Sequence, residues 1–319
     1  MSGAGGWKQE SFDYRDRPYR SRKTGKDVIK ERVDLSEEHS GWLENVYNQY
    51  DTGSCVANAT AAAYRFSARM LNNDSGTQNN QKLVDDPSRL FIYYNARNLP
   101  VEEYRTSRFS IDPSGGSENR DSFKGMDKFG VCSEKTWKWE NEPIPNKQNQ
   151  FTAKAINDKP KDDAYKEALA YRAVEYCRLD PDHSEDVENS LTDEERIAVG
   201  IVTLMQLKQC LSEGFPVVFG FWYYWKDLPW TKNEPIWGLP DLPADRKHKG
   251  PPPGKSFGGH TVLCIGYDVK RKEVLCQNSW GRGDGWTDSG KFWMPFSWIT
   301  DWECTDDFWM IRSIGDRKK

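Results

Sequence analysis

Long hydrophobic runs are missing from this chain of 319 residues. A membrane-spanning helix needs roughly 18 consecutive apolar residues, and no segment provides them. Residues 1–30 are polar and basic, whereas a secretory signal peptide carries an apolar stretch at this place. The sequence therefore predicts no membrane partner and a cytoplasmic location, with secretion by a non-classical route left open.

A large excess of charge of one sign is also missing. The 49 acidic residues nearly balance the 45 basic ones and leave a formal net charge of -4. Proteins that bind nucleic acid concentrate basic side chains, because attraction to the phosphates supplies much of the affinity. We therefore expect no nucleic acid partner, and we expect a monomer.

Paired cysteine spacings are absent as well. The seven cysteines are scattered and form no CxxC motif, which argues against a zinc ribbon and a dense disulfide framework. The sequence thus predicts a reducing compartment, no metal and no cofactor. Cys264 and Cys276 are expected to face each other across a hairpin as free thiols. Four acidic residues near the C-terminus are interpreted as a solvated turn and not as a cation site: Asp301, Glu303, Asp306 and Asp307.

The chain has enough apolar residues for a core, since 36% of it is hydrophobic. Residues 1–30 are the exception, because they contain almost no aliphatic side chains. We expect an extended arm there, a possible pro-segment or cleft latch, since an extended aromatic segment can lie in a cleft that accepts peptide backbone. The aromatic residues of this arm are Trp7, Phe12, Tyr14 and Tyr19. Residues 31–319 would form the folded domain.

Hydrophobic periodicity predicts helices in both lobes of this domain and strands toward its C-terminus. Apolar residues recur at steps of three and four in Cys55–Leu71, and Ala164–Leu179 and Leu204–Glu213 have similar spacing. Four later runs have strand character: Pro216–Tyr224, His260–Asp268, Glu273–Gln277 and Gly290–Met294. The sequence predicts an α+β protein with a mainly helical lobe at about 31–145 and a mainly β lobe, an antiparallel sheet or barrel, at about 150–319.

Cys55 is placed where a cysteine can act as a nucleophile. It follows Gly53 and Ser54 at the expected first turn of a helix, where unpaired backbone N–H groups and the helix dipole favour thiolate over thiol. Gln49, six residues earlier, could bring its side-chain amide beside the Cys55 N–H to form an oxyanion hole. The alternative for a lone cysteine is a buried structural thiol.

A histidine and an asparagine follow far downstream. His260 begins a predicted strand after two glycines, and Asn278 ends the strand that should pair with it. The hairpin would bring the imidazole and the amide together, so that the amide oxygen fixes the ring orientation. Trp280 would lie over this hydrogen bond and exclude water.

The order of these motifs resembles the papain family of cysteine peptidases, peptidase family C1. The features that carry the resemblance are Gln-x5-Cys at Gln49, Gly-His at His260 and Asn-Ser-Trp-Gly at Asn278. The similarity extends over roughly residues 33–313 and is closer to bacterial-type, disulfide-poor members than to lysosomal cathepsins. Residues 31–319 would be a papain-like catalytic domain with the active site in the cleft between its two lobes.

The resemblance implies roles for particular residues. Cys55 would attack a peptide carbonyl, His260 would carry the proton to the leaving amine, Asn278 would orient the ring, and Gln49 would complete the oxyanion hole. The substrate-binding residues would be Gly115, Gly116, Gly259 and Trp280.

The function that follows is a cysteine endopeptidase that hydrolyses peptide or protein substrates through a thioester on Cys55. Two alternatives use the same sequence features. An acyl transferase or peptide ligase would intercept the same thioester with an amine. An inactive papain-like binding module would have its cleft blocked by the arm or by the proline-rich insert Trp225–Lys255.

Overall fold

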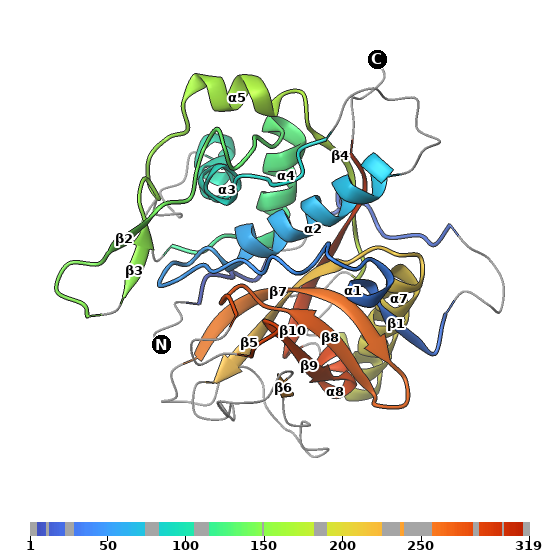
Figure 1. The fold of residues 1–319 in the computed structure, drawn as a ribbon. Helices are drawn as coiled ribbons and strands as arrows, with labels where there is room; N and C mark the ends of the chain where they lie inside the picture. Colours follow the sequence, from blue (N-terminus) through green and yellow to red (C-terminus); the bar gives the residue numbers. More distant parts are fainter. Residues whose placement is uncertain are drawn as a thin grey trace.

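Helix α2 (Cys55–Asn73) runs between two groups of elements in Figure 1. The computed structural model describes residues 5–10, 13–22, 29–73, 83–104, 115–148, 150–181, 190–224, 237–238, 257–282, 287–301 and 303–314. Most of α2 is buried, with alanines on several sides, which is expected of a helix covered all round. Its first turn can therefore face both groups of elements.

Helices form the group above α2 in Figure 1. They are α3 (Arg89–Tyr104), α4 (Asn119–Phe129) and α5 (Asp162–Ala168). A small hairpin of β2 (Asn141–Pro143) and β3 (Phe151–Ala153) lies between α4 and α5 in the chain. The ring of Phe91 on α3 packs against Tyr165 on α5, with centroids 5.0 Å apart. This is the helical lobe that the sequence predicts.

A sheet forms the group below α2. Its strand order is β4-β10-β5-β7-β8-β9-β6, and β1 pairs with β7 off this path. The strands span Ala173–Arg178 (β4), Thr305–Ile314 (β10), Val217–Tyr224 (β5), Phe257–Asp268 (β7), Glu273–Gln277 (β8), Lys291–Pro295 (β9), Trp237–Gly238 (β6) and Arg32–Asp34 (β1). Within the described residues all neighbours are antiparallel except β6 and β9. The sheet is not closed into a barrel, so the expected barrel is corrected to an open sheet.

Three helices flank the sheet: α1 (Leu35–Glu38), α7 (Asp193–Ser212) and α8 (Phe296–Thr300). Helix α7 begins well before the predicted Leu204, because Thr192 and Glu195 form a capping box at its start. All four predicted strands are present within a few residues of their expected bounds. Cys264 and Cys276 are paired across β7 and β8, and both are free thiols, as expected.

The predicted helix Ala164–Leu179 is wrong in its second half. Helix α5 ends at Ala168, and the residues from Ala173 to Arg178 form β4, which pairs with β10. Pairing with β10 overrides the local helical spacing there. Of the insert Trp225–Lys255, only Trp237 and Gly238 lie within the described residues, and Phe12 of the arm lies outside them.

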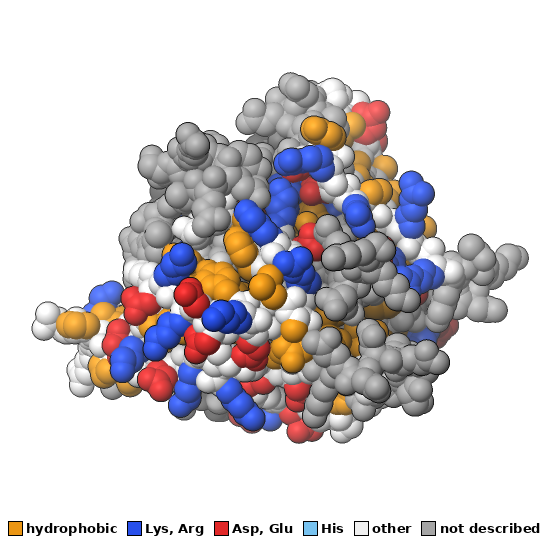
Figure 2. All heavy atoms as spheres, turned by 90° about the horizontal axis from the view of Figure 1, so that it is seen from above, with side chains coloured by type: hydrophobic (Ala, Val, Ile, Leu, Met, Phe, Trp, Pro, Cys, Tyr) orange, Lys and Arg blue, Asp and Glu red, His pale blue; other side chains and the backbone are white. Residues whose placement is uncertain are grey.

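The surface seen from above carries charge of both signs. Figure 2 shows basic and acidic side chains interspersed with apolar ones over the described part of this face. No described helix is long and apolar enough to cross a membrane.

Candidate active site

Cys55 is the first residue of α2 and is fully buried. The turn before it is fixed by side chains: Thr52 donates its hydroxyl to the Gln49 carbonyl at 2.6 Å and lies 2.7 Å from the Ser54 hydroxyl. One turn later the Asn58 amide donates to the Ser54 carbonyl at 2.9 Å. These bonds hold Cys55 at the helix N-terminus, as the sequence predicts.

His260 lies in β7 and contacts the two residues expected beside it. Its Nε2 is 2.7 Å from the Oδ1 of Asn278, which directly follows β8. The ring of Trp280 lies against the imidazole with centroids 4.9 Å apart. This arrangement fixes the ring and leaves Nδ1 as the imidazole nitrogen that faces away from Asn278.

Gln49 is tied to the segment that carries Asn278. Its backbone N–H donates to the Ser279 carbonyl at 2.8 Å, and its side-chain oxygen accepts a bond from the Ser279 hydroxyl at 2.6 Å. The amide nitrogen donates to the Thr52 carbonyl at 2.8 Å. The Gln49 side chain is thus buried and held on the loop that leads into α2, bonded to Thr52 three residues before Cys55.

Backbone contacts bring Cys55 beside the strand that carries His260. The N–H of Thr261, the residue after His260, hydrogen-bonds to the Cys55 thiol. The structure therefore brings Cys55, His260, Asn278 and Gln49 together in one region, although they come from widely separated parts of the chain.

Burial decides the ionisation of this pair in the structure. It raises the pKa of the Cys55 thiol to about 11, although backbone N–H groups of Thr261, Gly6 and Val56 oppose the shift. It also lowers the pKa of His260 to about 4, against the hydrogen bond to Asn278. The sequence argument for a lowered thiol pKa fails here, because loss of solvent outweighs the helix N-terminus. Burial thus disfavours the charged form of both groups while the arm covers them.

The arm provides the atoms that cover the thiol. The Gly6 N–H hydrogen-bonds to the Cys55 thiol, and Gly6 packs so closely on the loop before α2 that an added Cβ would lie 2.0 Å from the Gly53 carbonyl oxygen. The next residue, Trp7, is only 3% exposed. Its N–H donates to the carbonyl of Gly259, beside His260, at 3.2 Å.

The other side of the arm backbone pairs with the glycine segment that the resemblance singles out. The Ser117 N–H donates to the Gly6 carbonyl at 2.9 Å, and the Lys8 N–H donates to the Ser117 carbonyl at 3.1 Å. A Cβ at Gly116 would lie 1.9 Å from the Gly6 oxygen, so only glycine permits this approach. Gly115 instead accepts a bond from the Tyr93 hydroxyl at 3.0 Å.

Of the four expected substrate-binding residues, Gly116 and Gly259 contact the arm, Trp280 contacts His260, and Gly115 faces Tyr93. Sequence analysis missed Ser117, which makes the backbone pairing, and three residues around Trp7: Gly220, Trp222 and Asp307. Motif order cannot reveal them, because they become neighbours only through the sheet register.

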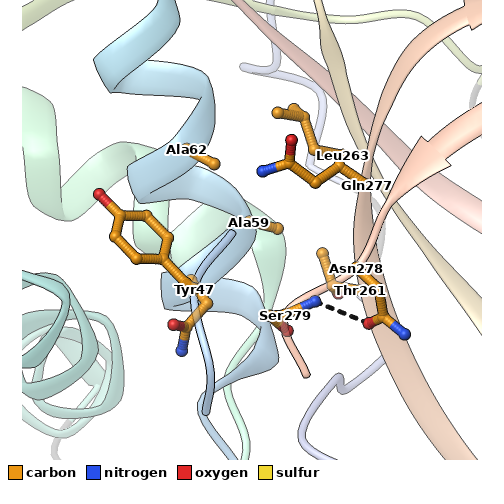
Figure 3. Close-up of a pocket in the computed structure, with 9 residues that line it drawn as sticks. Tyr47, Ala59, Ala62, Thr261, Leu263, Gln277, Asn278 and Ser279 are labelled. Atoms are coloured by element: carbon orange, nitrogen blue, oxygen red, sulfur yellow. Dashed lines mark hydrogen bonds between the residues drawn. The ribbon is translucent and has the colours of Figure 1, made fainter. Parts of the chain in front are cut away.

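A small hollow lies next to Asn278 and Thr261. Figure 3 shows it between α2, which contributes Ala59 and Ala62, and the strands that contribute Leu263 and Gln277. The buried Oε1 of Gln277 has no hydrogen-bond partner, so the lining is partly polar. The hollow lies between α2 and the sheet, and no described residue of the arm lines it.

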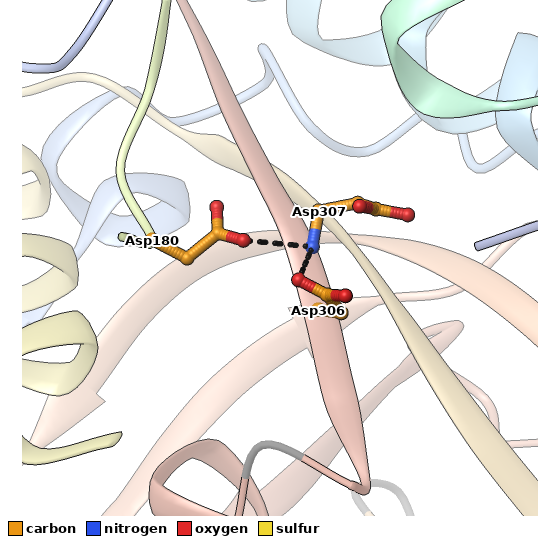
Figure 4. Close-up of side chains that lie close together, drawn as sticks. All are labelled: Asp180, Asp306 and Asp307. Carbon is orange, nitrogen blue, oxygen red and sulfur yellow. Dashed lines mark hydrogen bonds between the residues drawn. The ribbon is translucent and has the colours of Figure 1, made fainter. Parts of the chain in front are cut away.

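Three aspartates come together next to the indole N–H of Trp7. Figure 4 shows Asp180 beside Asp306 and Asp307 of β10, where the Asp307 N–H donates to Asp180 at 3.2 Å. The expectation of a solvated turn is wrong for Asp306 and Asp307, which are buried because they lie inside a central strand. Arg178 already places its guanidinium among the three carboxylates, 2.7 Å from Asp180. The cluster is an ion-pair network with its own cation.

Comparisons with known proteins point to one class. No family model matches the chain. An uncharacterised peptidase C1-like protein of Acanthamoeba polyphaga mimivirus is 30% identical over 269 residues, which make up 84% of this chain and 70% of that protein. The structure of xylellain, a cysteine protease from Xylella fastidiosa, is similar with a TM-score of 0.66 and 31% identity, over 98% of this chain and 97% of that one.

A more distant structure has the same fold. Digestive procathepsin L 3 of the Tenebrio molitor larval midgut matches with a TM-score of 0.53 and 15% identity, over 96% of this chain and 76% of that one. The site and these similarities define a papain-like cysteine peptidase. The chain belongs to peptidase family C1.

Proposed function

We propose that the chain is a cysteine endopeptidase in which Cys55 is the nucleophile. The main support for this proposal is the hydrogen bond of 2.7 Å between His260 and Asn278, beside a cysteine at a helix N-terminus. Cys55 would transfer its proton to His260 and attack the peptide carbonyl, and the imidazolium would then protonate the leaving amine. Water would hydrolyse the thioester and regenerate the thiol. Gln49 and the Cys55 N–H would stabilise the oxyanion.

Product analysis tests hydrolysis against acyl transfer. A peptide substrate is incubated with the protein in the presence of an added amine, and the products are identified by mass spectrometry. A hydrolase yields free carboxylate ends at every amine concentration used. A product in which the added amine is joined to the acyl fragment as the main species would favour the ligase instead.

Gln49→Ala is expected to lower kcat by on the order of 100-fold with little change in KM. The donor acts on charge that develops only in the transition state, so its loss leaves ground-state binding intact. Steady-state kinetics on a peptide substrate measure both constants. Gln206→Ala, on a half-buried glutamine of α7, is the matched control outside the oxyanion site and the arm. A loss confined to KM would remove Gln49 from that role.

We also propose that the arm is a latch that keeps the enzyme inactive. Its support is the position of Gly6 and Trp7, which occupy the backbone-binding groove between Ser117 and Gly259. The Gly6 N–H also hydrogen-bonds to the Cys55 thiol, so the arm covers the nucleophile. With water excluded, the neutral thiol and imidazole are also less able to form the reactive ion pair.

Buried ion pairs anchor the arm on the helical lobe and the sheet. Glu10 is completely buried and lies 3.3 Å from Arg120 of α4 and 3.5 Å from Arg178 of β4. It also accepts a bond from the indole of Trp309 on β10 at 3.1 Å. Asp16 forms a second pair with Arg120 at 2.6 Å. Removing Glu10 from these partners would take its acceptor oxygens away from two buried guanidinium groups, which favours the closed arm.

Docking of the arm is expected to weaken as pH rises toward 7. Burial raises the pKa of Glu10 to about 7, against opposition from Arg120 and Arg178 and with help from Asp180. A released Glu10 would titrate near its usual value of roughly 4.3. Between these two pKa values the docked state therefore holds one more proton than the released state. Docking is strongest below about pH 4.5, and its equilibrium constant falls by up to about 10-fold per pH unit until about pH 7.

The rate of Cys55 alkylation by iodoacetamide measures this effect. At each pH the rate for the Trp7→Ala chain, in which the arm is loosened, is divided by the rate for the unmodified chain, so that the intrinsic reactivity of the thiol cancels. This protection ratio should fall from pH 5 to pH 7, and Glu10→Gln should flatten it. An equal ratio at both pH values in the unmodified chain would contradict the linkage.

A further inference from the structure

The side chain of Trp7 fills a pocket next to the nucleophile. Its walls are Gly220 on β5, Gly259 on β7 and the ring of Trp222, whose centroid is 4.7 Å from that of Trp7. A Cβ at Gly220 would lie 2.0 Å from the indole, and one at Gly259 would lie 2.9 Å from it. Both glycines therefore make room for a wide, flat ring. We call this the Trp7 pocket.

The pocket has one carboxylate at its inner end. The indole Nε1 donates to the Oδ2 of Asp307 at 2.9 Å in a buried hydrogen bond. The other oxygen, Oδ1, faces Arg178 at 3.4 Å. Asp307 thus pairs with the cation of the network through one oxygen and presents the other to the occupant of the pocket. The same Oδ2 also accepts the N–H of Glu10 at 3.1 Å, so the arm uses this acceptor twice.

The backbone at Asp307 is adapted to this position. Its φ is 61°, in the left-handed region that side chains other than glycine seldom adopt. The residue lies where the register between β10 and β5 shifts, between Asp306 and Trp309. Its own carbonyl accepts a bond from the Asn119 amide at 3.0 Å, and Asn119 in turn accepts one from Thr261, next to His260. A bulge of this kind in a central strand turns a side chain, here that of Asp307, in a new direction. The strained backbone costs free energy, and such strain is often found at functional sites.

The Trp7 pocket lies where a substrate side chain would go. Gly6 is the arm residue at the thiol, and Trp7 is its neighbour along a backbone held by Ser117 and Gly259. An extended substrate that uses the same groove places a side chain in the same pocket, because side chains of extended chains alternate at fixed spacing.

We propose that Asp307 is a specificity-determining residue, which accepts a hydrogen bond from the substrate side chain that replaces Trp7, and that the pocket selects a tryptophan of the substrate. This inference rests on the proposed peptidase function and deepens it. The walls favour a planar aromatic ring, and the buried carboxylate favours a ring that carries an N–H donor. A buried acceptor left without a donor is costly, so rings that lack the N–H are discriminated against.

Matched peptides test this in the full chain with Trp7→Ala, which vacates the pocket. The peptides are identical except for one residue, tryptophan or 2-naphthylalanine, placed in turn at each of the three positions before the cleaved bond. The two side chains have similar size and flatness, but only indole has the N–H. At one position kcat/KM should favour tryptophan by at least about 10-fold. Equal values at all three positions, or a larger kcat/KM for an arginine peptide, would overturn the assignment.

Two variants connect the preference to the pocket. Asp307→Asn removes the charge but keeps the shape, so the preference should fall several-fold. Gly220→Ala narrows the wall, so the tryptophan peptide should lose at least about 10-fold while a peptide with alanine at that position keeps its rate. Gly125→Ala is the matched control, because its Cβ would come no closer than 3.7 Å to its neighbours. If Gly220→Ala slows both peptides equally, the pocket assignment fails even where Asp307→Asn does not fold.

The failure of this inference can be told apart from a failure of the proposed function. Cleavage that depends on Cys55 but shows no preference between the two rings overturns the pocket and leaves the peptidase. The absence of Cys55-dependent cleavage of every peptide overturns the peptidase and, with it, the substrate assignment.

Discussion

Cys55→Ala is expected to abolish peptide hydrolysis while the fold stays intact. The substitution removes one sulfur atom at the start of α2, where the backbone is held by Gln49, Thr52 and Asn58, and these bonds do not involve the thiol. Loss of the nucleophile in a triad-type enzyme removes most of the rate enhancement, on the order of 10⁵-fold or more in kcat. The loss should be seen both in the unmodified chain and with Trp7→Ala.

The control for this experiment is Cys132→Ala. Cys132 is also fully buried, but it packs in the helical lobe against Phe91 and Ala164. This variant should keep its activity, and both variants should keep the circular dichroism spectrum and a similar melting temperature. Hydrolysis that survives in a pure preparation of Cys55→Ala would end the assignment of the nucleophile.

The placement of the candidate catalytic residues beside one another could be predicted from local patterns, whereas their roles stay a proposal. Cys55 follows a Gly-Ser turn and starts a helix with clear periodicity, while His260 and Asn278 lie in and directly after neighbouring strands. The hairpin register then brings the imidazole and the amide within 2.7 Å. Local patterns were enough because the key contact is made between adjacent strands.

The residues around Trp7 could not be predicted in this way. Asp307 is brought to the arm by a contact that spans 300 residues of the chain, and Gly220 reaches it through the pairing of β5 with β7.

A run of acidic residues near the C-terminus favours a solvated turn by composition alone. Only the buried cations Arg120 and Arg178 explain why carboxylates are tolerated in the interior. Burial also explains why the pKa of the Cys55 thiol is raised, although its place at a helix N-terminus led us to expect a lowered pKa.

Trp7→Ala is expected to raise both the activity and the alkylation rate of Cys55. The indole is buried against Trp222 and donates to Asp307, and truncation of a buried tryptophan to alanine typically costs about 3–5 kcal/mol. The closed state would lose that stabilisation, whereas the open state, with the arm in solvent, would lose little. Because about 1.4 kcal/mol changes an equilibrium tenfold, the open fraction should rise on the order of 100- to 1000-fold, up to the point where the site is fully open.

The matched control lies in the same arm. Tyr14 is 84% exposed, so Tyr14→Ala removes an aromatic ring of the arm without touching the groove and should leave both rates unchanged. A synthetic peptide of residues 1–10 should then inhibit the Trp7→Ala chain, whereas the same peptide with alanine in place of its tryptophan should not. Equal rates of hydrolysis and of alkylation for the unmodified chain and both variants, with no inhibition by either peptide at high concentration, would contradict the latch proposal. The assignment of Cys55, His260 and Asn278 would stand, since none of these three depends on the arm for its position.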